Sequence, residues 1–95
     1  MTYRISKRAV RDLDGIWAYI ARDNPIAADR VDAELHAAMK LLGQLPDIGH
    51  RRNDVTDPRV RFWCVGSYLI AYRTERSTTI VVRVVHGARD IGRLF

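Results

Sequence analysis

The sequence predicts an α+β fold, in which a short N-terminal strand and an antiparallel helical hairpin pack on a C-terminal antiparallel sheet. Two observations predict it. Apolar residues recur at helical spacing through the first half of the 95-residue chain, and strand-like apolar runs fill the second half. No repeat, linker or low-complexity segment interrupts this β-α-α-β-β-β order, so residues 1–95 are expected to form one domain.

The first two elements are a short strand and a helix. Polar and apolar residues alternate around Tyr3 and Ile5, which predicts a strand. Ser6 is a good N-cap for a helix that begins at Lys7. Gly15 lies inside this helix and is typical of a close approach by another element, because glycine lowers helix stability by ~1 kcal/mol against alanine. The apolar stripe of the helix consists of Ala9, Leu13, Ile16, Trp17 and Ile20.

A second helix follows after a very short junction. The residue before a proline is pushed away from helical angles, so the first helix should end near Asp23. Asn24 can cap the second helix, and Pro25 can take its first position, where a missing N–H costs nothing. The second stripe ends near Leu45-Pro46 and consists of Ala28, Val31, Leu35, Ala38, Met39, Leu42 and Leu45. The two helices are therefore expected to form an antiparallel hairpin.

Three strand-like runs follow a polar loop over residues 49–58. They cover residues 60–65, 68–74 and 79–85. Gly66-Ser67 is a two-residue hairpin signal between the first two runs. The third run is almost entirely Val and Ile, which predicts a central strand covered on both faces.

The register of the last hairpin stays open at this point. A two-residue loop at Arg76-Ser77 would place Arg73 and Arg83 on opposite faces of the sheet, whereas a three-residue loop would place them together. The sequence alone therefore does not predict a single arginine patch.

The composition is that of an ordinary globular protein with an anionic partner. Hydrophobic residues make up 47% and charged residues 28% of the chain, and no apolar run approaches the ~18–20 residues of a membrane span. The N-terminus has no signal-peptide pattern, so the cytoplasm is the expected location, with no membrane partner. Residues 49–95 hold nine arginines against four acids, a surplus of five that accounts for the whole net charge of +5. Such a basic half favours nucleic acid or an acidic protein segment as partner.

The histidines and the single cysteine predict neither a metal site nor a cofactor. The three histidines are scattered without metal-ligand spacing, and His36 is placed to form a surface pair with Asp32 one helical turn away. Cys64 lies in a strand-like run, where cysteine commonly behaves as a small buried hydrophobe. The simplest interpretation of His86 is a hydrogen bond to the backbone at a strand end.

The sequence resembles the RelE/ParE toxin superfamily over nearly its whole length. Five segments carry the resemblance by their order and spacing, namely Ala9-x-x-x-Leu13-x-x-Ile16-x-x-Tyr19-Ile20-Ala21, Asn24-Pro25-x-Ala27-Ala28, Leu45-Pro46-x-x-Gly49, Tyr68-x-Ile70-x-Tyr72-Arg73 and Val84-Val85-His86-Gly87-Ala88-Arg89-Asp90. The resemblance implies a growth-inhibiting toxin of a type II toxin–antitoxin system, with a role in plasmid stabilisation. It also implies a hetero-oligomeric complex with a cognate ParD-like antitoxin.

The superfamily has two branches, and the residues favour one of them. RelE-like members cleave mRNA on the ribosome, which needs an acid, a base and cations at the phosphate, whereas ParE-like members interfere with DNA gyrase. RelE-like toxins place an arginine after the tyrosine that opens the second meander strand, and often a tyrosine at the C-terminus. Here these positions hold Leu69 and Phe95. The sequence favours the ParE branch without catalytic residues, but the ribonuclease alternative stays open, with His86, Arg89 and Arg61 as its catalytic set.

Two groups of binding residues are expected. The surface for the target would use the basic half and the tail, namely Arg61, Arg89, Arg93 and Phe95. The antitoxin would supply an apolar, acidic segment that is disordered when free and orders on the toxin. The toxin residues expected to bind this segment are Trp17, Arg73 and Arg83. An aromatic residue in a helix stripe, such as Trp17, is however more often part of the core. A non-toxic binding module is the third hypothesis.

Overall fold

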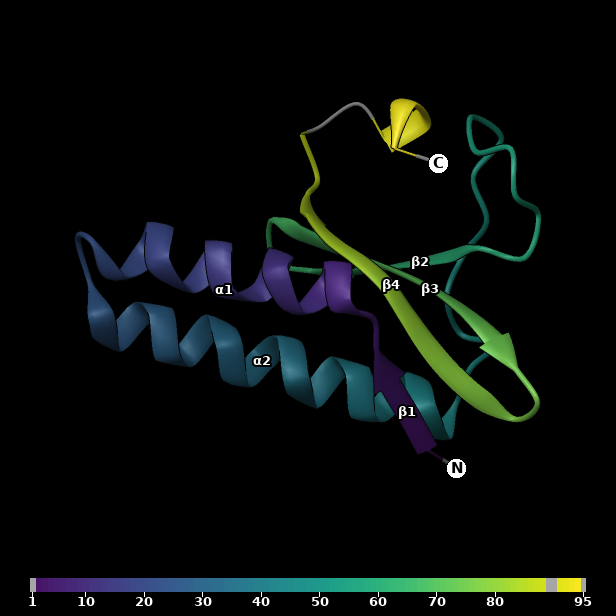
Figure 1. The fold of residues 1–95 in the computed structure, drawn as a ribbon, viewed down its shortest axis with the longest axis horizontal. Helices are drawn as coiled ribbons and strands as arrows, with labels where there is room; N and C mark the ends of the chain where they lie inside the picture. The colour runs from purple at the N-terminus through teal and green to yellow at the C-terminus, as the bar shows by residue number, and fades with distance from the viewer. Residues whose placement is uncertain (1, 89–90, 95) are drawn as a thin grey trace.

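The computed structural model describes residues 2–88 and 91–94, and within these ranges a pair of helices covers one face of a four-stranded mixed sheet (Figure 1). The elements in chain order are β1 (Thr2–Ile5), α1 (Lys7–Ala21), α2 (Pro25–Gln44), β2 (Arg61–Val65), β3 (Tyr68–Glu75), β4 (Thr78–His86) and a 3-10 helix, η1 (Ile91–Arg93). The α+β class and the element order are confirmed. Neither helix is long and apolar enough to span a bilayer.

The two helices begin at the residues that the sequence predicts. The Ser6 hydroxyl accepts a hydrogen bond from the Ala9 N–H at 3.0 Å, and it also donates to the Val82 carbonyl at 2.9 Å. The Asn24 side chain accepts from the Ala27 N–H at 3.0 Å. Each cap satisfies one of the backbone donors that a helix start leaves free.

The strand order is β1-β4-β3-β2, so β4 is central as predicted. The meander of β2, β3 and β4 is antiparallel, but β1 pairs with β4 in parallel, from Thr2 beside Thr78 to Ile5 beside Val81. The whole sheet is therefore mixed. The chain runs from β1 to its parallel neighbour β4 through α1, α2, β2 and β3, a connection long enough for parallel pairing.

A β-bulge decides which way the arginines of β3 and β4 face. Arg76 and Ser77 form a two-residue loop with φ values of 48° and 65°, typical of a type I′ turn. The register runs from Arg73 opposite Ile80, but it shifts between Ala71 and Tyr72, so that Arg83 lies opposite Ala71. The expectation that a two-residue loop places Arg73 and Arg83 on opposite faces is wrong, because the extra residue of the bulge turns Arg83 over.

Each face of the sheet has its own apolar cluster. The helix-side cluster consists of Ala9, Leu13, Leu35, Met39, Leu42, Ile70, Tyr72, Val81 and Val84. The outer cluster, on the face away from the helices, consists of Val55, Val60, Phe62, Leu69, Ala71, Val85 and Ile91. The loop before β2 and η1 thus cover the outer face, where Figure 1 shows them on the side of the sheet opposite the helices.

The position of Cys64 differs from the expectation. Cys64 is exposed, so its prediction as a small buried hydrophobe is wrong. It lies on β2, which is the edge strand of the sheet, opposite Leu69. Cys64 stays exposed although it lies in a strand, because the outer cluster buries Phe62 and Leu69 but does not extend to Cys64.

Candidate functional site

A groove of about 650 Å³ lies between α1 and the ends of β3 and β4. We call it the α1 groove; its lining includes Arg11, Gly15, Ile16, Tyr19, Tyr68, Val84 and His86. Tyr19 on its rim is 71% exposed. A Cβ atom built on Gly15 would have no atom of another element within 4 Å. The close packing of another element against Gly15, which the sequence suggested, is therefore not made by the described part of the chain.

Trp17 lies on α1 outside the core. Its side chain is 42% exposed, and its indole Nε1–H donates to Asp29 Oδ1 at 2.8 Å. Another large apolar side chain of the helical hairpin, Ile26, is 80% exposed. Trp17 is thus accessible to a partner, and its role in antitoxin binding stays a prediction.

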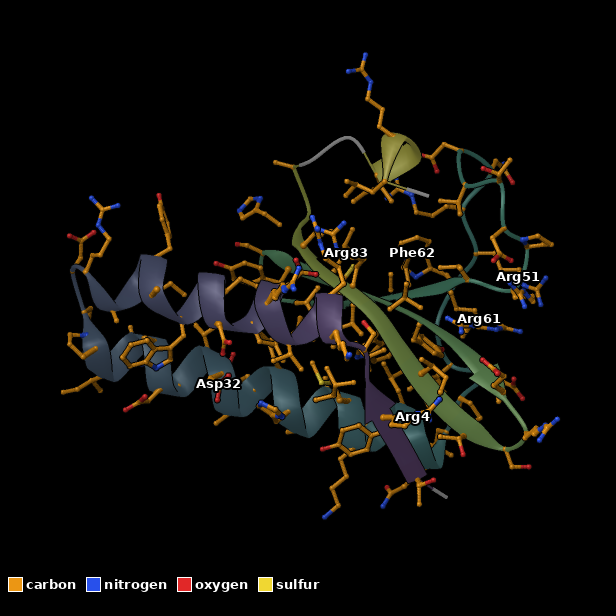
Figure 2. The ribbon with its side chains drawn as sticks, viewed as in Figure 1. Arg4, Asp32, Arg51, Arg61, Phe62 and Arg83 are labelled. Atoms are coloured by element: carbon orange, nitrogen blue, oxygen red, sulfur yellow. The ribbon has the colours of Figure 1, made fainter. Side chains whose placement is uncertain are left out.

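Arg83 has an internal partner. Its guanidinium donates to both carboxylate oxygens of Asp12, at 2.8 Å from Nε and 3.1 Å from Nη2, and both side chains are nearly buried. Asp12 also accepts the Val84 N–H at 2.9 Å. Figure 2 labels Arg83 at β4 close to α1. Arg83 therefore joins α1 to β4, and its predicted contact with an antitoxin would have to compete with this ion pair.

His86 and Arg61 lie at opposite ends of the sheet. His86 is paired with Tyr68, whereas Arg61 is paired with Tyr72, four residues further along β3. This offset is about 13 Å along the strand, and β3 separates the two side chains. His86 Nδ1 accepts the Ala88 N–H at 3.1 Å, which confirms the backbone interpretation, and its ring lies edge-on to Tyr68 at 5.6 Å. Arg89, the third residue of the ribonuclease set, lies outside the described residues.

A second hollow, of about 220 Å³, lies at the other end of β3 from the α1 groove. We call it the basic hollow; its lining consists of Asp47, Arg51, Arg59, Arg61, Tyr72, Arg73 and Thr74. Figure 2 shows Arg51 and Arg61 close to each other beside the start of β2. The hollow unites one residue predicted to bind the target, Arg61, with one predicted to bind the antitoxin, Arg73.

Hydrogen bonds hold Arg59, Arg61 and Arg73 of the basic hollow in place. Arg61 Nη1 donates to the Gly49 carbonyl at 3.0 Å, and Arg73 Nη2 donates to Glu75 at 2.9 Å. Arg59 forms a two-pronged contact with Asp57, at 3.1 Å from Nε and 2.9 Å from Nη2. These bonds lower the pKa of Asp57 to about 2, with the Arg59 side chain as the largest cause and the Arg59 backbone N–H as the next.

Tyr72 supports the floor of the basic hollow. Its hydroxyl donates to the Pro46 carbonyl at 2.6 Å and accepts the Gly49 N–H at 2.9 Å. Burial raises the pKa of this phenol, and the bond from Gly49 opposes part of that rise. A Cβ atom on Gly49 would overlap the Tyr72 hydroxyl, so only glycine fits there. Tyr72 therefore fixes the turn that carries Asp47.

Arg93, another residue predicted to bind the target, does not line either site. Arg93 is exposed on η1, and Phe95 lies outside the described residues. His36 pairs with Asp32 at 3.6 Å on the surface, as expected. Within residues 2–88 and 91–94, no three His, Cys, Asp or Glu side chains gather as a metal site would require.

Sequence reasoning missed Arg51 and Arg59. Arg59 lies in the turn before β2, which begins at Arg61, so strand periodicity does not describe its position. Arg51 is brought in by the path of an irregular loop, which no periodicity describes.

The chain is similar to known proteins over nearly its whole length. Residues 3–91 match the family described as the ParE toxin of type II toxin-antitoxin system, parDE. A curated protein of Sinorhizobium fredii (strain NBRC 101917 / NGR234), named "Putative toxin Y4kP", is 37% identical over 83 residues, which are 87% of this chain and 84% of that protein. A solved chain described as "Chromosomal ParDE TA system from P. aeruginosa" has a TM-score of 0.75 and 21% identity, over 90% of this chain and 95% of that one, and shows the same fold.

Proposed function

The chain belongs to the ParE toxin family of type II toxin–antitoxin systems, and from this premise we propose that it inhibits DNA gyrase and is neutralised by a cognate antitoxin. In this proposal the toxin binds a large macromolecular target and does not itself catalyse the cleavage of covalent bonds. The similar solved structure is described as a ParDE system, which supports an antitoxin of the ParD kind.

One observation supports gyrase over RNA as the target: the separation of His86 from Arg61. A ribonuclease of this type needs an acid, a base and a cation around one phosphate. An arginine stays protonated and cannot serve as the base, and the offset of about 13 Å keeps His86 from sharing a phosphate with Arg61. Both residues lie on the helix side of the sheet, and the face between them is filled, because Ile70 and Val84 are buried in the helix-side cluster.

The α1 groove is the proposed seat of the antitoxin. Its walls combine apolar side chains, such as Ile16 and Val84, with the charge of Arg11, which suits an apolar segment carrying acids. Gly15 in the groove leaves room for the partner's backbone to come close, which this chain's own elements do not do. The neighbouring exposed ring of Tyr19 would be covered in the complex.

Induced expression of the chain without its antitoxin tests the proposal. Inhibition of gyrase should produce filamentous cells with damaged DNA while protein synthesis continues. An immediate stop of translation, with mRNA cut inside codons by primer extension, would instead support the ribonuclease alternative. Normal growth at good expression would point to a non-toxic binding module.

A further inference from the structure

The basic hollow gathers guanidinium groups from separate parts of the chain. Arg51 comes from the loop after α2, Arg59 and Arg61 flank the start of β2, and Arg73 comes from β3. Arg59 lies in the turn just before β2, and β2 begins with Arg61 opposite Tyr72, next to Arg73 on β3. Cations held this close repel one another, and a bound anion would relieve that repulsion.

The carboxylates near the hollow do not satisfy all of these arginines. Arg61 has only Asp47, at 4.0 Å, and the side chain of Asp47 is 92% exposed. Arg51 makes no hydrogen bond or ion pair with the described residues. The Nε–H of Arg73 is buried and has no acceptor within the described part of the chain. The guanidinium groups of Arg51 and Arg61 therefore keep donors for a ligand, whereas the buried Arg73 Nε–H could be reached only if its side chain moved.

The chemistry of the hollow suits a phosphate better than an acidic peptide. A phosphate accepts hydrogen bonds from several directions at once, and the planar fork of arginine matches its oxygens. A volume of about 220 Å³ leaves room for such a group. An ordered peptide segment also needs apolar anchor sites, and the hollow is lined by charged and hydroxyl groups, in contrast to the α1 groove.

We propose that the basic hollow binds a phosphodiester group of duplex DNA, with Arg51 and Arg59 as accessible contacts and Arg61 and Arg73 deeper in the site. The inference deepens the proposed function and rests on it, because gyrase would present the DNA. The α1 groove is lined by Ser67 and Tyr68 and the hollow by Tyr72 to Thr74, so the two sites use opposite ends of β3. An antitoxin segment seated in the groove would therefore leave the hollow open.

The test measures DNA binding in the absence of gyrase. A fluorescein-labelled 20-base-pair duplex is titrated with the full chain, and its anisotropy is followed over a series of salt concentrations. The hollow variant carries Arg51→Gln and Arg59→Gln. The matched control carries Arg22→Gln and Arg30→Gln, which removes two exposed arginines of the helical hairpin and leaves the same net charge. Urea denaturation verifies that both variants are folded.

We expect the hollow variant to bind the duplex roughly tenfold more weakly and to lower the slope of log K against log salt by about 2, one for each lost phosphate contact. The control should bind within a factor of about 2 of the wild type. Equal weakening of both variants would overturn the inference, since net charge alone would then explain it. A competition experiment gives a second check. If oligoglutamate of the same total charge displaces the labelled duplex as effectively as unlabelled DNA does, the inference is also overturned.

The outcome is separable from that of the proposed function. If the wild-type chain inhibits gyrase but its DNA binding does not depend on the residues of the hollow, only this inference is refuted. DNA binding that depends on the hollow, in a chain without effect on gyrase, would refute the proposed target alone.

Discussion

At the scale of single residues, Asp12 shows why a charged side chain on a helix can be structural. Its carboxylate accepts two bonds from Arg83 and a third from the Val84 N–H. The two ionised side chains are nearly buried, with 12% of Asp12 and 10% of Arg83 exposed. The helical periodicity of α1 could not predict this ion pair, because it holds no information about an arginine 71 residues away.

We predict that Asp12→Asn lowers the free energy of unfolding by about 3–5 kcal/mol, because it leaves Arg83 charged, nearly buried and without its partner. Urea denaturation followed by far-UV circular dichroism measures this change. Asp14→Asn removes the same charge from an exposed position on α1 and is the control. Equal stabilities of the two variants would show that the ion pair is not structural.

The hydroxyl of Tyr72 is a second residue-scale support, since it bridges Pro46 and Gly49. We predict that Tyr72→Phe lowers the free energy of unfolding by about 1–3 kcal/mol, because the Gly49 N–H would lose its acceptor. Tyr19→Phe removes a hydroxyl from an exposed ring and should leave stability nearly unchanged. A Tyr72→Phe variant as stable as the control would contradict the assigned role.

The same hydroxyl predicts a dependence of stability on alkaline pH. Burial raises the pKa of Tyr72 above its ordinary value of about 10 in the folded state. The unfolded chain therefore loses this proton first, and the contribution of Tyr72 to stability is present below pH 10 and is lost as the pH rises through the folded-state pKa. The free energy of unfolding of the wild type should thus fall more steeply than that of Tyr72→Phe as the pH rises above about 10. Parallel curves would contradict this.

At the scale of elements, α1 closes an edge of the sheet as well as covering its face. β1 pairs with β4 only as far as Val81, and beyond it the Ser6 N–H and hydroxyl donate to the carbonyls of Val81 and Val82. Asp12 then accepts from Val84. An open edge of β4 would invite pairing with other chains, so these contacts protect the central strand.

The elements also show what sequence patterns can and cannot predict. Ser6, Asn24 and Pro25 predicted the helix starts correctly, because capping depends on residues adjacent in sequence. The bulge between β3 and β4 was not predictable, since it depends on how two strands fit together. The outer cluster was missed for a related reason: the loop carrying Val55 has no periodicity, and its burial depends on the sheet below it.

Gly15 on α1 leaves open space in the α1 groove, where the antitoxin is proposed to bind. Gly15→Gln should fold, because a Cβ atom there meets no other atom within 4 Å, but its side chain would fill space proposed for the antitoxin. We expect affinity for the cognate antitoxin to fall at least about tenfold by calorimetry, since a wrongly placed side chain in an interface easily costs about 1.4 kcal/mol. Ala18→Gln, at an exposed position on the same helix, is the control. Unchanged affinity for Gly15→Gln would place the antitoxin elsewhere.

At the scale of the whole molecule, the fold separates two kinds of surface. The α1 groove, with its apolar walls, lies at one end of β3, and the basic hollow, with its guanidinium groups, lies at the other. The net charge of the second half of the sequence predicted a basic surface but not its location. Arg83 is taken up internally by Asp12, while Arg51, Arg59, Arg61 and Arg73 share one hollow. That division depends on tertiary contacts that a charge count cannot represent.

The central claim is that this toxin acts on gyrase by binding. The most direct test adds the purified chain to purified DNA gyrase and relaxed plasmid, with ATP, and measures both supercoiling and the amount of linear DNA released after protease treatment. The account predicts that micromolar toxin lowers supercoiling and raises linear DNA, and that the antitoxin reverses both effects. Unchanged supercoiling with no trapped cleavage complex at that concentration would contradict it.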